Sequence, residues 1–358
     1  MATIFGALTL SDSDRVFNAT QGQAVIFDAV QQYLAQVNAE IDRTSSIFVE
    51  RTTDAYKSRY YLPGGGTLQK MGTDGRPGAV KATGSWDVAF PLEEWGAQLA
   101  GGQVAMAYMT VAELDRHVQT IALQNVNTVR FEILKRLFNN VQTSFSDPLW
   151  GTLLVEPIAN GDTVTYPPVL GAADPATENH FLGSAYAASS ISDTNNPFVT
   201  IRDELEEHFG NNGEGNIAVF INTAQAAKTE ALTDYDPISD RFIQVGANTD
   251  VPINAPANLP GRVIGRTNGV WVVDWKYIPA NWMLGIDLSA PKPLIKRVDP
   301  ADTGLPEGLQ LVAKEAQYPF EASFWRHRFG FGAGNRLNGV VMDMNNTDSD
   351  YDIPSAYA

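Results

Sequence analysis

The sequence contains no cysteine among its 358 residues. This absence excludes disulfide bonds, thiolate catalysis and metal sites built from cysteine ligands. Histidine is nearly as scarce, and the four histidines form no i,i+4 pair and no His-Glu-x-x-His motif: His117, His180, His208 and His327. Each is therefore interpreted as a surface or packed histidine, and we expect no metal ligand among them.

Basic residues are few, with 25 Lys and Arg against 41 Asp and Glu, a net charge of −16 and a pI near 4.6. Such an acidic surface repels phosphate, which argues against recognition of DNA or RNA through a basic face. Long apolar runs are also lacking, since none approaches the ~18 residues of a membrane span. The first residues show no secretory signal pattern, so we expect a soluble protein made in a cytoplasm.

Motifs for catalysis are missing as well. The sequence has no Gly-x-Ser-x-Gly elbow and no phosphate-binding Gly-x4-Gly-Lys-Ser/Thr loop. Gly330, Gly332 and Gly334 begin like a dinucleotide fingerprint, but Asn335 replaces its third glycine, so Gly330 and Gly332 are predicted to be structural, through φ > 0 or close backbone contact. Glu93 and Glu94 are adjacent and would point to opposite faces of a strand. The sequence therefore predicts no enzyme, no cofactor and no metal.

The most prominent feature that is present is a long helical pattern from Thr110 to Val141. Thr110 and Glu113 have the spacing of a capping box, which marks its start. The apolar residues lie on one face in the first half and are displaced around the axis in the second half: Val111, Leu114, Val118 and Ile121, then Val129, Ile133, Leu137 and Val141. We expect a spine whose two ends have different neighbours.

Before this helix, residues 1–20 read as an arm and Gln21 to Arg43 as an amphipathic helix. The apolar face of that helix carries Phe27, Val30, Leu34, Val37 and Ile41, and we interpret it as packing on its own domain rather than on a coiled-coil partner.

Residues 47–62 and 79–92 are β-rich runs around a Gly/Pro-rich loop, which predicts one long hairpin. An isolated two-stranded ribbon is marginal in water, so the hairpin must rest on something else. Its basic residues outnumber its acidic ones, which favours contact with an acidic neighbouring copy over the alternative of a solvated flap. We assign this contact to the tip residues Leu68, Lys70, Met71 and Arg76.

The second half alternates strands and helices. A helix is predicted over 198–209, whose residues Asp203, Glu204, Glu206 and Glu207 we interpret as a solvated face. A buried strand is predicted over 217–222, with a helix capped by Thr223 and running to about Leu232. Asn268-Gly269 between apolar runs predicts a tight hairpin. A strand region follows over 314–329, and residues 330–344 are expected to close the folded part before an acidic tail.

The order of these parts resembles the major capsid protein of tailed bacteriophages, the Hong Kong 97-type fold. The sharper similarity lies toward the carboxyl end, in GRVIGRTNGVWVV (261–273), IPANWMLGID (278–287), RHRFGFG (326–332) and NRLNGVV (335–341).

This resemblance implies an α+β fold of six parts. They are an N-terminal arm and helix (1–45), an extended E-loop hairpin (46–108), a P-domain spine helix (109–148), an α/β A-domain (149–290), returning P-domain strands (291–345) and an acidic tail (346–358).

The implied function is a shell subunit that forms hexamers and pentamers of an icosahedral virion around double-stranded DNA, assembled in the host cytoplasm. The implied partners are further copies, a separate scaffolding protein, a portal and a possible decoration protein. We expect no covalent crosslink of Lys70 to Asn335 or Asn338, because nothing in the sequence selects that pair. The alternatives are an encapsulin-like compartment and a β-rich carbohydrate-active enzyme.

Overall fold

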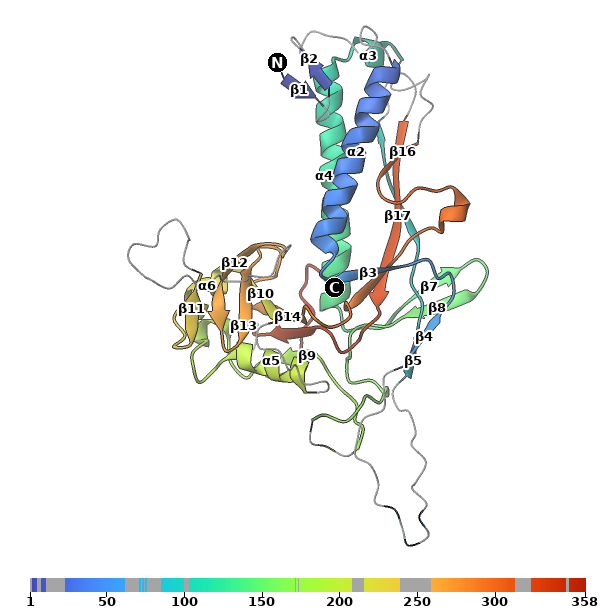
Figure 1. Cartoon of the computed structure of the whole chain (residues 1–358). Helices are drawn as coiled ribbons and strands as arrows, with labels where there is room; N and C mark the ends of the chain where they lie inside the picture. Colours follow the sequence, from blue (N-terminus) through green and yellow to red (C-terminus); the bar gives the residue numbers. More distant parts are fainter. Residues whose placement is uncertain are drawn as a thin grey trace.

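The computed structural model describes residues 2–4, 8–10, 23–61, 71, 73, 75, 85–99, 103–170, 172, 174–207, 216–238, 259–312, 323–345 and 348–358. It has a mixed fold of helices and sheets. Two long helices form one end of the molecule, a sheet flanked by helices lies to one side, and short hairpins lie to the other (Figure 1). No helix of the described part is both long enough and apolar enough to cross a membrane.

The predicted spine is helix α4, Val111–Phe138, and its capping box is present. The Thr110 side chain accepts a hydrogen bond from the Glu113 backbone N–H, while the Glu113 carboxylate accepts one from the Thr110 N–H. These two bonds satisfy amide groups that the first turn leaves without partners. The helix ends three residues earlier than predicted, and Val141 is exposed rather than packed.

The displaced apolar faces of α4 contact two different cores, as predicted. Its first half packs with helix α2, Gln23–Ser45, in a cluster that includes Val30, Leu34, Leu114 and Val118. Its second half contributes to a larger cluster that also holds residues of the lateral sheet. Helix α2 therefore packs within its own chain, in agreement with the interpretation of its apolar face. Helix α3, Gln103–Tyr108, precedes α4.

A five-stranded sheet lies beside the two long helices (Figure 1). Its strands are β3 Val49–Thr52, β6 Glu93–Leu99, β15 Leu294–Arg297, β16 Gln310–Val312 and β17 Ser323–Ala333. Alternate residues of β17 are buried, namely Trp325, His327, Phe329 and Phe331. This alternation follows from the two-residue period of a strand with one face turned to the helices.

A seven-stranded sheet forms the lateral body, in the order β11-β12-β13-β10-β14-β18-β9. Its strands are β9 Phe181–Gly183, β10 Ile217–Ile221, β11 Tyr235–Pro237, β12 Arg262–Thr267, β13 Val270–Asp274, β14 Trp282–Asp287 and β18 Val340–Asp343. Strand β10 is buried along its whole length, because hydrophobic clusters pack on both faces of the sheet. Helices α5, Pro197–Glu206, and α6, Thr223–Thr229, lie against this sheet.

The predicted Asn-Gly hairpin is present between β12 and β13. Asn268 and Gly269 have φ angles of 48° and 85°. Two successive positive φ angles match the twist of the flanking strands, which is why this dipeptide is such a strong hairpin signal.

Three further strand pairs and two short 3-10 helices complete the described part. The pairs are β1 Ala2–Ile4 with β2 Leu8–Leu10, β4 Ser58–Tyr61 with β5 Ser85–Val88, and β7 Thr143–Asp147 with β8 Gly151–Val155. The 3-10 helices are η1 Ala188–Ser190 and η2 Ala301–Thr303.

The prediction of one long hairpin over residues 47–92 is wrong in its first strand. Strand β3 pairs in parallel with β15, and within the described residues the hairpin pair consists of β4 and β5. Strand β6 pairs with β17, so residues 93–99 belong to the five-stranded sheet and not to the hairpin. Both pairings join segments that are distant in the chain, which alternation within one segment cannot reveal.

The expectation that the fold ends before an acidic tail is also wrong. The Tyr351 hydroxyl donates to the Phe138 carbonyl oxygen at 2.6 Å, and the Tyr357 hydroxyl donates to the Tyr277 carbonyl oxygen at 2.8 Å. Tyr357 stacks on Phe138 and is 7% exposed. The described tail, residues 348–358, is therefore fixed to the end of α4 by two aromatic anchors.

Two predictions around α5 and α6 need correction. Glu204 and Glu207 are half-buried rather than solvated, because that side of α5 packs over the segment that leads into β9. The N-cap of α6 is Asn222 instead of Thr223, and this helix ends at Thr229 instead of Leu232.

Candidate functional site

The hairpin base formed by β4 and β5 is anchored in the protein interior. Trp86, Val88 and Phe90 are buried, and they join a cluster with Tyr166 and Ile295. This burial gives the second run of the hairpin an apolar face and identifies what the hairpin rests on. The base therefore contributes to the core, in contrast to a freely attached flap.

The opposite face of the same hairpin base carries an ion-pair cluster. The Arg59 guanidinium donates two hydrogen bonds to the Asp87 carboxylate, at 2.5 and 2.9 Å, and Lys57 donates to it at 3.2 Å. These bonds, led by that from Arg59, hold the pKa of Asp87 well below its usual range. Lys57 and Arg59 thus share a carboxylate of their own chain, which reduces the local basic surplus by one charge.

Of the four predicted contact residues at the hairpin tip, the structure describes Met71 alone. Its side chain is exposed. Leu68, Lys70 and Arg76 lie outside the described residues. The assignment of these four to an inter-subunit contact remains a prediction.

Gly330 and Gly332 lie in β17 where other segments cross it closely. A Cβ atom on Gly330 would collide with the Pro91 carbonyl oxygen, and one on Gly332 would lie 2.9 Å from the Phe90 ring. Neither glycine has a positive φ angle. A structural glycine can be required by a positive φ angle or by close contact with another segment. The geometry supports close contact, and substitution at these positions tests that explanation.

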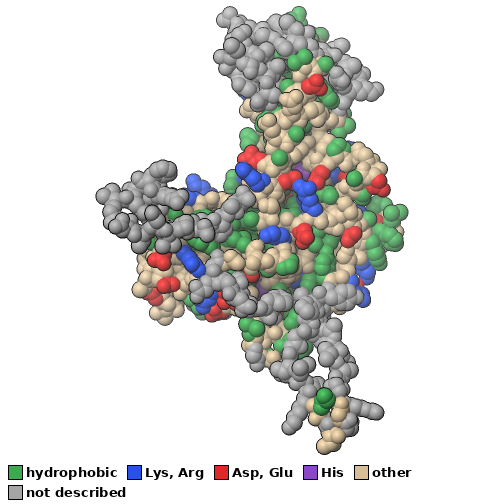
Figure 2. All heavy atoms as spheres, viewed as in Figure 1, with side chains coloured by type: hydrophobic (Ala, Val, Ile, Leu, Met, Phe, Trp, Pro, Cys, Tyr) green, Lys and Arg blue, Asp and Glu red, His purple; other side chains and the backbone are tan. Residues whose placement is uncertain are grey.

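Exposed apolar side chains gather at the β7–β8 turn, the right-hand edge in Figure 2. Leu149 is 82% exposed and Trp150 is 51% exposed, while the Tyr56 ring lies 4.5 Å from that of Trp150. Leu154 on the adjoining strand is also exposed. Such a patch on a projecting element is typical of a protein contact surface.

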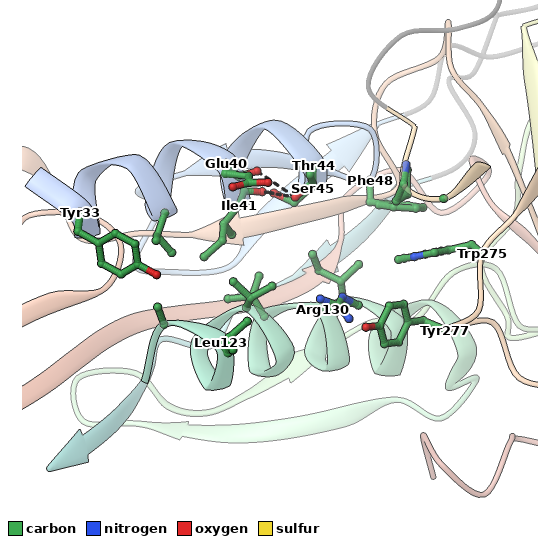
Figure 3. Close-up of a pocket in the computed structure, with 17 residues that line it drawn as sticks. Tyr33, Glu40, Ile41, Thr44, Ser45, Phe48, Leu123, Arg130, Trp275 and Tyr277 are labelled. Atoms are coloured by element: carbon green, nitrogen blue, oxygen red, sulfur yellow. Dashed lines mark hydrogen bonds between the residues drawn. The ribbon is translucent and has the colours of Figure 1, made fainter. Parts of the chain in front are cut away.

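A groove of about 450 Å³ lies between α2, α4 and the segments before β12 and after β13 (Figure 3). Its walls are largely apolar, with Ile41 and Phe48 on one side and Leu123 on the other. Arg130 lies over the Tyr277 ring at 3.8 Å, a cation–π contact that closes one end. The Thr44 and Ser45 hydroxyls at this groove donate to backbone carbonyl oxygens of α2, and the largely apolar lining suits an apolar group.

Comparison with known proteins gives a likeness in structure alone. No family model matches the chain, and no curated protein matches it. A solved structure of Mycobacterium phage Patience aligns with a TM-score of 0.65 and 18% identity, covering 100% of this chain and 96% of that chain. The chain therefore shares the fold of that phage protein over its full length, in agreement with the mixed fold predicted from sequence.

Two further solved structures align at lower scores. The capsid of a native GTA particle has a TM-score of 0.48 and 11% identity, covering 85% of this chain and 90% of that chain. The capsid of the cyanophage P-SCSP1u has a TM-score of 0.46 and 9% identity, covering 83% and 85%.

Proposed function

We propose that this chain is the major capsid protein of a tailed bacteriophage, a subunit that assembles into hexamers and pentamers of an icosahedral shell around double-stranded DNA. The observation that carries this proposal is the shared fold with the Patience phage protein across essentially the whole of both chains. A match of this extent includes the helices, both large sheets and the hairpins together.

The architecture supports the proposal independently. Two cores are joined by one long helix, and the hairpin elements project from the body with exposed apolar side chains. A chain that functions alone gains little from such extensions, whereas a subunit of a shell can cover them with neighbouring copies.

In this proposal the parts predicted from the sequence keep their order and roles, with three changes to their boundaries. The order is the arm and helix, the E-loop, the P-domain, the A-domain and the returning strands. Residues 93–99 join the P-domain sheet, because β6 pairs with β17. Residues 49–52 join it too, through β15, and residues 348–358 pack on α4.

The partners follow from this role: further copies of the chain, a separate scaffolding protein, a portal and, in some shells, a decoration protein. The packaged DNA would be held without sequence-specific binding, because the net charge of −16 keeps the genome from adhering to the lumen. The protein would reside in the virion after assembly in the host cytoplasm.

The test is the mass of the purified native species by light scattering, together with its absorbance at 260 and 280 nm. A capsid gives particles of many subunits, with nucleic-acid absorbance once filled. Particles of the same kind that enclose protein would instead indicate an encapsulin-like compartment. A monodisperse species of tens of kilodaltons would overturn the proposal and return attention to an enzyme.

A further inference from the structure

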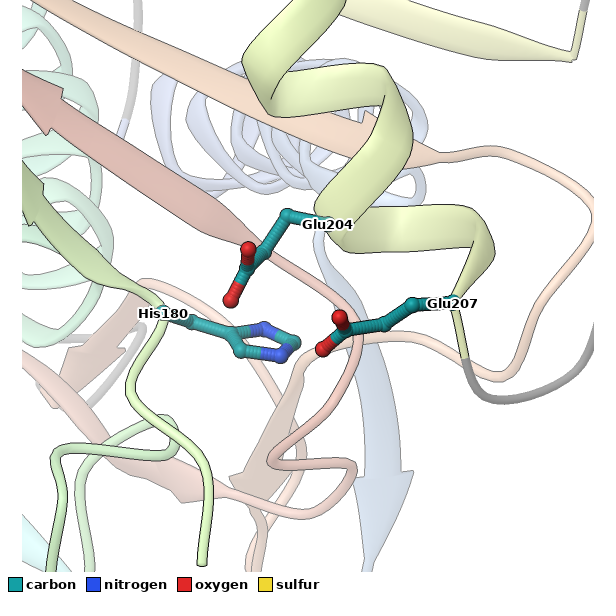
Figure 4. Close-up of side chains that lie close together, drawn as sticks. All are labelled: His180, Glu204 and Glu207. Carbon is teal, nitrogen blue, oxygen red and sulfur yellow. The ribbon is translucent and has the colours of Figure 1, made fainter. Parts of the chain in front are cut away.

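Three side chains with metal-binding atoms converge beside the lateral sheet, away from the hairpins and the groove (Figure 4). His180 lies just before β9, Glu204 lies in α5 and Glu207 follows the last residue of that helix. One ligand atom from each lies within 4.8 Å of the other two. The i,i+3 spacing places both carboxylates on one side of the helix, turned toward the imidazole ring.

The imidazole is held in the orientation that metal-binding histidines use. His180 is 1% exposed, and its Nδ1 lies 3.0 Å from the Gly339 carbonyl oxygen. Because a carbonyl oxygen only accepts hydrogen bonds, Nδ1 must carry the proton. In the neutral ring the Nε2 lone pair is then the metal-binding atom, and the backbone bond fixes the ring plane.

The negative charge at this place exceeds what a half-buried site favours. Burial, then the neighbouring Glu178, raises the pKa of Glu204 to about 7. Burial raises the pKa of Glu207 to about 7 as well, followed by Glu204 and Glu178. Every cause of these two shifts disfavours the carboxylate charge.

We propose that His180, Glu204 and Glu207 form a site for a divalent transition metal of the zinc class. One imidazole nitrogen with carboxylate oxygens is a donor set that suits Zn²⁺ better than Ca²⁺, which prefers oxygen ligands alone. Ligand atoms at ~2.1 Å from a tetrahedral zinc lie roughly 3.4 Å apart, so small side-chain rotations would close the site.

Such an ion would fasten the end of α5 to the segment before β9 and, through Gly339, to the start of β18. The segment before β9 is already joined to β18 by a backbone hydrogen bond from the Val341 N–H to the His180 carbonyl oxygen, so the ion would add the end of α5 to this edge of the sheet. The inference concerns residues of one chain and does not depend on the proposed shell.

The test uses the purified full chain, stripped with a chelator, and Zn²⁺ as the probe. Isothermal titration should show one saturable site per chain, weakened at least tenfold in the double variant Glu204→Gln with Glu207→Gln. Glu206→Gln on the same helix and His117→Ala on α4 are matched controls and should bind as the parent does. Ca²⁺ should bind at least tenfold more weakly than Zn²⁺.

Thermal melting distinguishes Zn²⁺ binding by Glu204 and Glu207 from a purely structural role of these two residues. In chelator the double variant should melt at or above the parent temperature, because like-charge repulsion has been removed. Added Zn²⁺ should raise the melting temperature of the parent and leave that of the variant unchanged. The proposal is overturned if the parent shows no saturable Zn²⁺ binding. It is also overturned if the parent and the double variant bind Zn²⁺ equally and show the same shift in melting temperature, or if the melting temperature of the parent depends on pH but not on Zn²⁺.

Discussion

Arg336 is fully buried, and its guanidinium donates to the Pro157 carbonyl oxygen at 2.8 Å while pairing with Asp162 at 2.8 Å. Lys296 is 5% exposed and pairs with Glu307 at 3.0 Å. Buried charges need such partners, because desolvation is otherwise costly. Sequence reasoning singled out neither residue, since the partners come from distant parts of the chain. It interpreted each histidine as a surface or packed residue without deciding between the two, and His180 and His327 are buried.

Valine at Gly330 is expected to lower stability and soluble yield, by about 3 kcal/mol, because its Cβ would overlap the Pro91 carbonyl oxygen. Valine at Gly332 should cost less, about 1–2 kcal/mol, since it meets side chains that can shift. Chemical denaturation of each variant measures this. Phe324→Val, an exposed position in the same strand, is the control and should change little. Normal stability in both glycine variants would disprove the close-contact explanation.

His327 should make the protein less stable in mild acid. Burial, then Lys296, lowers its pKa to about 3, while in the unfolded chain it titrates near ~6.5. Between these values the unfolded chain binds a proton that the native chain excludes. The contribution of His327 to the free energy of unfolding should therefore be full above pH ~6.5 and fall by about 1.4 kcal/mol per pH unit below it.

The variant His327→Gln isolates this effect, because it keeps an amide donor toward the Asn125 side chain, which lies 2.7 Å from Nδ1 of His327. Denaturant unfolding at pH 7.5, 6 and 5 should show a shallower loss of stability in the variant. His117→Gln, at an exposed position on α4, should keep the parent slope. Equal slopes in all three proteins would refute the assignment.

At the scale of elements, the sequence predicted what local chemistry determines. The capping box of α4, the apolar face of α2 and the Asn268-Gly269 turn each depend on neighbours within a few residues, and each is present. The pairing of β3 with β15 and the packed tail depend on contacts between distant segments. The cluster of His180 with Glu204 and Glu207 was missed for the same reason, although the i,i+3 spacing of the glutamates was visible.

Removal of Pro63 to Gly78, with the strands closed by Asn-Gly, should leave a folded subunit and prevent shell formation. Among the hairpin residues that the structure describes, Trp86 and Val88 are buried in the base, and the deletion retains both. Circular dichroism and thermal melting should match the parent, while sedimentation should show no particles.

Two outcomes would contradict this expectation in different ways. Unfolding of the deleted subunit would mean that the removed segment belongs to the core. Normal shells would mean that the tip makes no essential contact, which would also remove the assigned roles of Leu68, Lys70, Met71 and Arg76.

At the scale of the whole molecule, charge should influence assembly. The chain carries −16, yet Lys57 and Arg59 of the hairpin are paired with Asp87 in their own chain. Asp87 therefore offsets one of these two positive charges, and the other remains for attraction between subunits together with the basic residues predicted at the tip. Assembly should weaken in 1 M salt, where the Debye length is ~3 Å. Sedimentation at low and high salt measures this, and an unchanged particle fraction would show that the contacts are apolar.

The long helix α4 also has a mechanical consequence. One end is fixed in the core of the lateral sheet through Leu137 and Phe138, and the other end packs against α2. Its 28 residues make a rigid arm. At ~1.5 Å per residue the arm is about 42 Å long, so a tilt of about 10° at the Phe138 end displaces the far end by about 7 Å. In the proposed shell, we expect a small repacking around Phe138, where Tyr357 also stacks, to be amplified in this way into the change of curvature between five-fold and six-fold positions.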